Sequence, residues 1–92
     1  MFVIRRLRAH DPISVDGINA LLRQQSPGAV ERSIEDAELR TEVLSNQNFH
    51  LLVAESEHGY IGMASMFFQR NLARWMAEIH DVVVLEEHRG KG

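Results

Sequence analysis

Residues 82–92 read Val-Val-Val-Leu-Glu-Glu-His-Arg-Gly-Lys-Gly, and this stretch decides the fold. Its first half is β-branched and apolar, which favours a strand covered on both faces. Its second half, Arg89-Gly90-Lys91-Gly92, is a basic glycine-rich turn. Such a turn after a strand presents backbone N–H groups and cations to an anion, and a helix N-terminus completes the site. We therefore expect a phosphate-binding α/β domain that continues into a helix beyond Gly92.

The composition bounds the class of protein. The chain has 92 residues, 45% of them hydrophobic and 25% charged, which indicates one small globular domain over residues 1–92, part of a larger fold. A net charge of -3 argues against nucleic-acid binding. No apolar run approaches the roughly 20 residues of a membrane helix, so no membrane is expected. The absence of cysteine excludes disulfides and fits the cytoplasm.

The first half of the chain predicts a strand and two helices. Residues 2–8 alternate imperfectly between apolar and polar, as in a short strand. Asp11 and Pro12 fit an N-cap and first position of a helix that runs to about Gln25. Ser33 and Asp36 resemble a capping box for a second helix, which ends near Ser45.

The second half predicts three strands. Residues 49–56 form an apolar run, Glu57-His58-Gly59 reads as a tight turn, and residues 60–69 return as the next strand. After a polar break at Arg70-Asn71, residues 75–85 give a fourth strand. The predicted order is strand, helix, helix, strand, strand, strand in a mainly antiparallel sheet.

This order and its last motif resemble the GNAT superfamily of acyl-CoA-dependent N-acyltransferases. The family's phosphate loop follows the fourth strand as Gln/Arg-x-x-Gly-x-Gly/Ala, and Arg89 to Gly92 match its first four positions. Gly59-Tyr60-Ile61-Gly62 also resembles the start of the family's third strand. Glu86 stands where many relatives have proline. The resemblance covers the whole chain but only about the first half of the expected domain, and it implies transfer of an acetyl group from acetyl-CoA to a primary amine.

The resemblance implies a place for each part of the cosubstrate acetyl-CoA. The pantetheine arm would lie along Val82, Val83 and Val84 like an added strand. The pyrophosphate would take backbone bonds at Gly90 and Gly92 and charge from Arg89 and Lys91. His88 would line the loop or be an exposed turn residue. The alternative for the loop itself is a plain chain tail.

An acidic residue on the fourth strand serves as the base in several relatives. Glu78 is the first candidate and His80 the second, because they are two residues apart on one strand face. Asp81 should point to the other face unless a bulge intervenes. The simpler alternatives are a solvated Glu78 paired with an arginine and a structural His80. The second helix carries acidic residues that are either solvated or attract a cationic amine: Glu31, Glu35, Asp36, Glu38 and Glu42.

Other readings and partners stay open. The five histidines show no metal-binding spacing, so no metal is expected. The acceptor would be a small-molecule or peptide amine. A non-catalytic sheet module, binding a partner or a second copy through its open edge, is the main alternative, and a homo-oligomer is expected from that edge. A regulatory nucleotide-binding fragment is weaker, because no Walker or Rossmann pattern is present.

Overall fold

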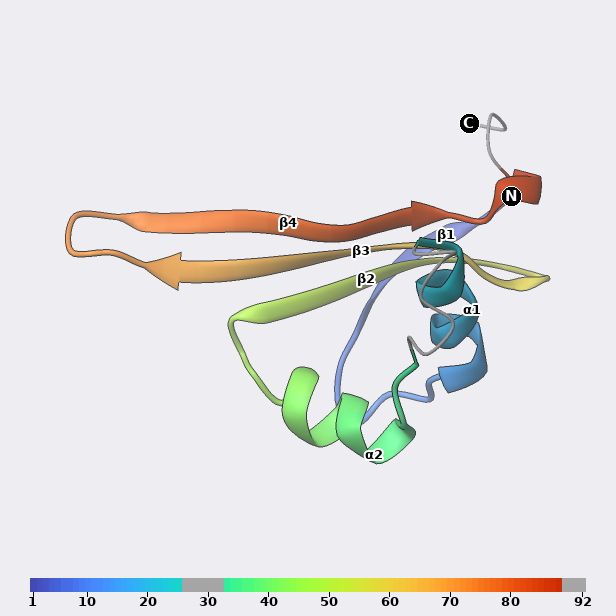
Figure 1. Cartoon of the computed structure of the whole chain (residues 1–92), viewed down its shortest axis with the longest axis horizontal. Coiled ribbons are helices and arrows are strands. Elements are labelled where there is room, and N and C mark those ends of the chain that lie inside the picture. Colours follow the sequence, from blue (N-terminus) through green and yellow to red (C-terminus); the bar gives the residue numbers. More distant parts are fainter. Residues whose placement is uncertain (26–32, 89–92) are drawn as a thin grey trace.

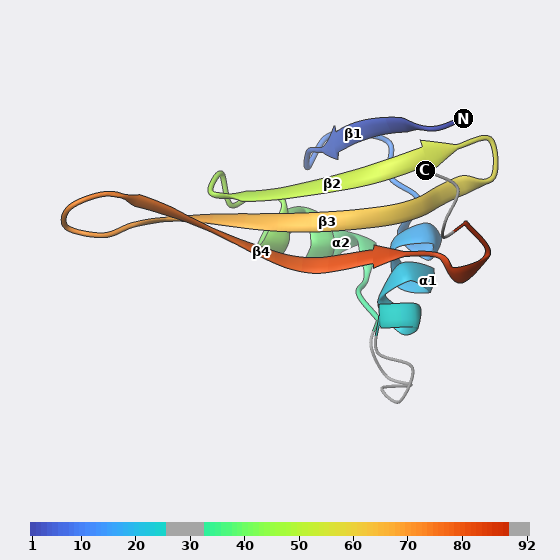
Figure 2. The same ribbon diagram turned by 90° about the horizontal axis from the view of Figure 1, so that it is seen from above.

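The computed structural model describes residues 1–25 and 33–88, and its centre is an antiparallel sheet in the order β1-β2-β3-β4. Helices α1 and α2 lie on one face of this sheet (Figures 1 and 2). The predicted order of elements is confirmed. The strands are β1 Val3–Leu7, β2 Phe49–Ser56, β3 Gly59–Arg70 and β4 Trp75–Val84. The helices are α1 Val15–Gln25, α2 Asp36–Glu38 with a π-helical continuation Leu39–Val43, and the 3-10 turn η2 Glu86–His88.

The β2–β3 hairpin forms where the sequence predicts it. The turn lies at Glu57 and His58, and β3 begins at Gly59 with a φ of 97°. Only glycine adopts this conformation without steric cost, so Gly59 sets the end of the turn. The pairing of Val53 with Met63 then places both on the face that carries the helices.

The expectation that both faces of the valine run are covered is wrong for the described part of the chain. Val83 is buried at 5% exposure, whereas Val82 and Val84 are 63% and 40% exposed. The reason is that α1 and α2 cover one face, and no described helix covers the other (Figure 1).

The first helix starts later than Asp11 and Pro12 predict. It begins at Val15, and the Ser14 hydroxyl accepts a hydrogen bond from the Gly17 N–H at 3.1 Å, as an N-cap does. The Asp11 carboxylate instead accepts the N–H of Arg8 at 2.8 Å and closes the turn after β1. An aspartate can cap a helix or close a turn in this way, so the sequence pattern alone placed the cap at the wrong residue.

The second helix is capped by Glu35 and Glu38 rather than by Ser33 and Asp36. The two glutamates form the reciprocal capping box, with the Glu38 carboxylate accepting the Glu35 N–H at 3.4 Å. The helix ends at Val43, two residues before the predicted position.

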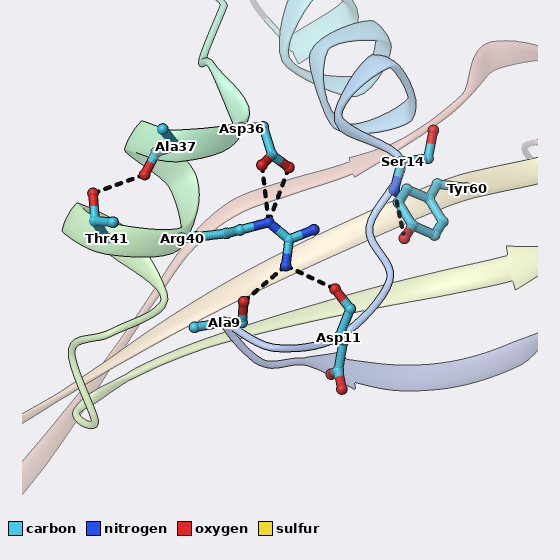
Figure 3. Close-up of polar contacts among 8 residues, drawn as sticks. All are labelled: Ala9, Asp11, Ser14, Asp36, Ala37, Arg40, Thr41 and Tyr60. Carbon is cyan, nitrogen blue, oxygen red and sulfur yellow. Dashed lines mark hydrogen bonds and ion pairs between the residues drawn. The ribbon is translucent and has the colours of Figure 1, made fainter.

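Arg40 anchors this helix to the segment that follows β1 (Figure 3). Its Nε donates to both Asp36 carboxylate oxygens at 3.0 Å, and its Nη1 donates to the carbonyls of Ala9 and Asp11 at 2.7 and 2.8 Å. One guanidinium therefore joins α2 to the β1–α1 connection, and the planar fork of arginine suits that bridge.

Helix α1 approaches β3 closely at Gly17. The Tyr60 hydroxyl accepts the Ser14 N–H at 3.2 Å, which holds the buried Tyr60 ring against the first turn of the helix. A Cβ on Gly17 would lie 2.9 Å from Tyr60 Cδ2. Glycine is therefore required here by packing, although it weakens a helix by about 1 kcal/mol relative to alanine.

We predict that Gly17→Ala destabilises the chain. Overpacking costs about 1 to 3 kcal/mol, which exceeds the gain in helix propensity of about 1 kcal/mol. Urea unfolding measures the change. In a Tyr60→Leu background, where the ring is gone, the same change should raise the free energy of unfolding. Stabilisation by Gly17→Ala alone would show that the ring does not restrict this position.

Candidate active site

The end of β4 is tied to α1 by one side chain, Gln24. Its Nε2 donates to the Val84 carbonyl, and its Oε1 accepts the Glu86 N–H at 2.9 Å. Between these bonds, the Leu85 N–H donates to the Ile61 carbonyl of β3 at 2.8 Å. The chain that leaves β4 toward residue 89 is thus fixed on two sides before η2 begins.

Gly62 lets β4 approach β3 closely at this end. Gly62 pairs with Val84, and a Cβ on it would lie 3.2 Å from the Val83 carbonyl oxygen. That distance is within the tightest contacts of real side chains, so a larger residue would press on the backbone of β4. The second glycine of Gly59-Tyr60-Ile61-Gly62 therefore has a packing role at the end of the fourth strand.

A β-bulge interrupts β4 just before the valines. Met63 pairs with Val83 and Ser65 with His80, so the register shifts by one residue between them. Asp81, in the bulge, has a φ of 52° and is the one non-glycine residue with positive φ among residues 1–25 and 33–88. Aspartate tolerates this left-handed conformation better than most residues, and such strain clusters at functional sites.

Ser65 holds the bulge. Its hydroxyl is within hydrogen-bond distance of the Asp81 Oδ2 at 2.9 Å and of the His80 carbonyl at 3.1 Å, and the residue is fully buried. Ser65 and Asp81 both line a cavity of about 420 Å³ between the sheet and the two helices. Asp81, which lies in the bulge, therefore lines this cavity together with Ser65. The sequence predicts Asp81 on the opposite face from Glu78 and His80 unless a bulge intervenes, and the bulge is present.

Glu78 and His80 form a pair on the same strand. His80 Nε2 lies 3.0 Å from Glu78 Oε2, and each side chain is 53% exposed. Among the described residues Glu78 is paired with this histidine and not with an arginine. Neither residue lines the cavity, but their partners on β3 are Ser65 and Phe67, and Ser65 does line it. The pair therefore lies beside the cavity wall on β4, where His80 directly precedes Asp81.

The structure describes some of the residues that are expected to bind the cofactor. Val82 to Val84 form the end of the last strand in the sheet order, and His88 ends η2. Arg89, Gly90, Lys91 and Gly92 lie outside the described residues. The structure adds three residues that sequence reasoning did not single out as a group, namely Gln24, Ser65 and Asp81.

The described residues contain neither a metal-binding cluster nor a membrane-spanning helix. No group of three or more histidine, cysteine, aspartate or glutamate side chains is arranged to hold a metal ion. No helix within residues 1–25 or 33–88 is long and apolar enough to cross a membrane.

Comparison with solved structures finds the same fold in several acetyltransferases. A protein described as an acetyltransferase from Agrobacterium tumefaciens is 26% identical, with a TM-score of 0.80 over 98% of this chain and 63% of its own. Glucosamine-6-phosphate N-acetyltransferase from Arabidopsis thaliana is 28% identical, with a TM-score of 0.77 over 99% of this chain and 65% of its own. An aminoglycoside acetyltransferase from an uncultured soil sample, in complex with trehalose, is 22% identical, with a TM-score of 0.76 over 99% and 60%.

The chain spans less than two thirds of the length of these structures. No curated protein sequence matches it. The sequence model of the acetyltransferase (GNAT) family matches residues 15–92, which include α1 and α2, the strands β2, β3 and β4, and the glycine-rich sequence of residues 89–92. The chain belongs to the GNAT acetyltransferase family.

Proposed function

We propose that the protein transfers an acetyl group from acetyl-CoA directly to a primary amine, with β4 as the strand on which donor and acceptor meet. The observation that carries this proposal is the position of the bulge. At Asp81 the strand reaches the cavity, and immediately after it come the valines proposed to hold the donor. A thioester bound along those valines would therefore lie next to an amine bound in the cavity.

The end of β4 is suited to hold the pantetheine arm. No strand lies beyond β4 in the sheet order of the described residues, so an extended ligand can add along that edge. Gln24 fixes the backbone at Val84 and Glu86, which lead to the proposed pyrophosphate loop, residues 89–92. Backbone N–H groups at the two glycines and the charges of Arg89 and Lys91 would bind the phosphates.

The Glu78 and His80 pair is the proposed proton acceptor. Amine attack on the thioester requires a neutral nitrogen, so a base must take one proton from the ammonium form. The two side chains lie 3.0 Å apart and half exposed, and a water molecule could link either of them to the cavity that Asp81 of the same strand lines. The cysteine-free composition supports the cytoplasm as the proposed location.

The second candidate is a non-catalytic module that self-associates. Exposed apolar side chains on both outer strands favour it, including Val3 and Ile4 on β1 at 59% and Ile79 and Val82 on β4 at 65% and 63%. Surfaces of this kind on strand edges promote pairing with a second copy. The two functions differ in whether acetyl-CoA binds at the end of β4.

We predict that replacing Arg89 and Lys91 together by alanine weakens acetyl-CoA binding at least tenfold in calorimetry. Each charge-assisted bond to a phosphate contributes about 1.5 to 3 kcal/mol. The matched control, Arg5 and Arg8 changed to alanine, removes the same charge in β1 and just after it, and should leave the affinity unchanged. Unaltered binding in the first variant would remove residues 89–92 from the donor site. A chain that binds no acetyl-CoA but forms a stable dimer in light scattering would favour the second candidate.

We predict that Gln24→Met weakens acetyl-CoA binding about five- to tenfold, since two hydrogen bonds that position the end of β4 are lost. Methionine keeps the length and packing of the side chain, so the free energy of unfolding should change by less than about 1 kcal/mol. Gln25→Met, one position along the helix, is the control and should bind normally. Equal affinities of Gln24→Met and Gln25→Met for acetyl-CoA would show that the hydrogen bonds of Gln24 do not contribute to binding.

We predict that Glu78→Gln lowers turnover by about 100-fold near neutral pH and by less at high pH, because solution then supplies the neutral amine. The pH profile of the mutant-to-wild-type ratio is the measurement. His80→Gln is compared in parallel. A flat ratio for Glu78→Gln with a pH-dependent ratio for His80→Gln would move the role of base to the histidine.

A further inference from the structure

The cavity beside the β4 bulge has the size and lining of a small-molecule site. Its volume of about 420 Å³ falls within the usual range of ligand pockets, roughly 300 to 1,000 Å³. Most of its wall is apolar and comes from both helices and from β2 and β3, with Leu22, Val43, Phe49 and Met63 among the contributors. A ligand that fills it must therefore present mostly carbon.

The charged side chains among the described lining residues of the cavity are all acidic. Asp81 lies on the sheet side, Glu38 lies on the helix side, and no lysine or arginine is among the described residues of the lining. Asp81 Oδ2 accepts the hydroxyl of the fully buried Ser65, whereas Oδ1 makes no hydrogen bond with the described part of the chain. One carboxylate oxygen, oriented by a buried serine, is therefore available to a cationic ligand.

We propose that this cavity binds the acceptor, and that the acceptor is a primary amine with an apolar carbon body whose ammonium group contacts Asp81. The inference rests on the proposed acetyl transfer and names its substrate class. A polyhydroxylated amine is disfavoured, because hydroxyls that contact Leu22, Val43 and Phe49 would lack hydrogen-bond partners there.

The reaction balances without a further reactant. The bound ammonium loses one proton to the Glu78 and His80 pair, directly or through a water molecule, and its nitrogen forms a bond to the thioester carbonyl carbon. The carbon–sulfur bond then breaks, and the leaving thiolate takes the second nitrogen proton. The products are an N-substituted acetamide, the free thiol of CoA and one proton. Asp81 acts here by holding the cation beside the donor strand.

Amine binding to the chain without acetyl-CoA tests this inference. NMR titration with butylammonium, pentylammonium and hexylammonium should shift the amides of Ser65 and Asp81. The affinity should rise about fourfold for each added methylene, since each one removed from water contributes about that factor. Glucosamine, a polar amine, and hexanol, an uncharged analogue, should each bind at least tenfold more weakly than hexylammonium.

Two variants separate charge from shape. Asp81→Asn keeps the size of the side chain and its tolerance of positive φ, and it should reduce hexylammonium binding to the level of hexanol. Glu57→Gln, in the β2–β3 turn, removes one charge that is not part of the described cavity lining and should have no effect. Val43→Phe adds a ring to the cavity wall and should abolish binding of hexylammonium and hexanol alike.

The outcomes distinguish this inference from the proposed function. Glucosamine binding as tightly as hexylammonium, or hexylammonium shifts away from the cavity, would overturn the assigned acceptor class. Acetylation of glucosamine by a protein that does not bind hexylammonium would also overturn it, while leaving acetyl transfer in place. Hexylammonium binding as described, without acetyl transfer to any amine, would support the cavity and contradict the proposed function.

Discussion

The contact of the buried Ser65 hydroxyl, which donates to the Asp81 carboxylate and also lies within hydrogen-bond distance of the His80 carbonyl, is the constraint on which the site depends. It stabilises a bulge with a strained aspartate in the middle of an otherwise regular strand. The bulge shifts the pairing by one residue, so that Ser65 pairs with His80 while Val83 pairs with Met63, and Asp81 lies between them beside the cavity. With the bulge, β4 places the Asp81 carboxylate beside the cavity. One residue later, at Val82, begins the strand edge along which the thioester is proposed to lie.

Helix α1 contributes both to the packing of the core and to the geometry of the site. Gly17 allows the first turn of α1 to contact Tyr60, and the last turn places Gln24 against Val84 and Glu86. The helix also supplies Ile18 and Leu22 to the cavity wall. A shift of α1 would therefore alter the cavity and the end of β4 together, which links the stability of the fold to both proposed binding sites.

Much of the fold follows from local sequence, and most of the site does not. The hairpin at Glu57-His58-Gly59 and the strand of residues 49–56 carry clear local signals, and the structure has both. The cap of α1 was misplaced because Asp11 and Ser14 both suit a cap, and only the tertiary contact of Ser14 with Tyr60 decides between them. Gln24 carries no local sequence signal for its role, because it bonds residues about 60 positions away. Asp81 was visible in the sequence, but its direction depended on a bulge that the serine of another strand creates.

The central claim is that the donor binds along β4 after the bulge, and hydrogen exchange in the presence of CoA tests it directly. The account predicts slower exchange of amides between Val82 and His88 and no change in β1. Another basic surface in the described part of the chain is a groove lined by Arg6, Arg8, His10 and Arg40 near the end of β1. Protection confined to that groove, with β4 unchanged, would contradict the account.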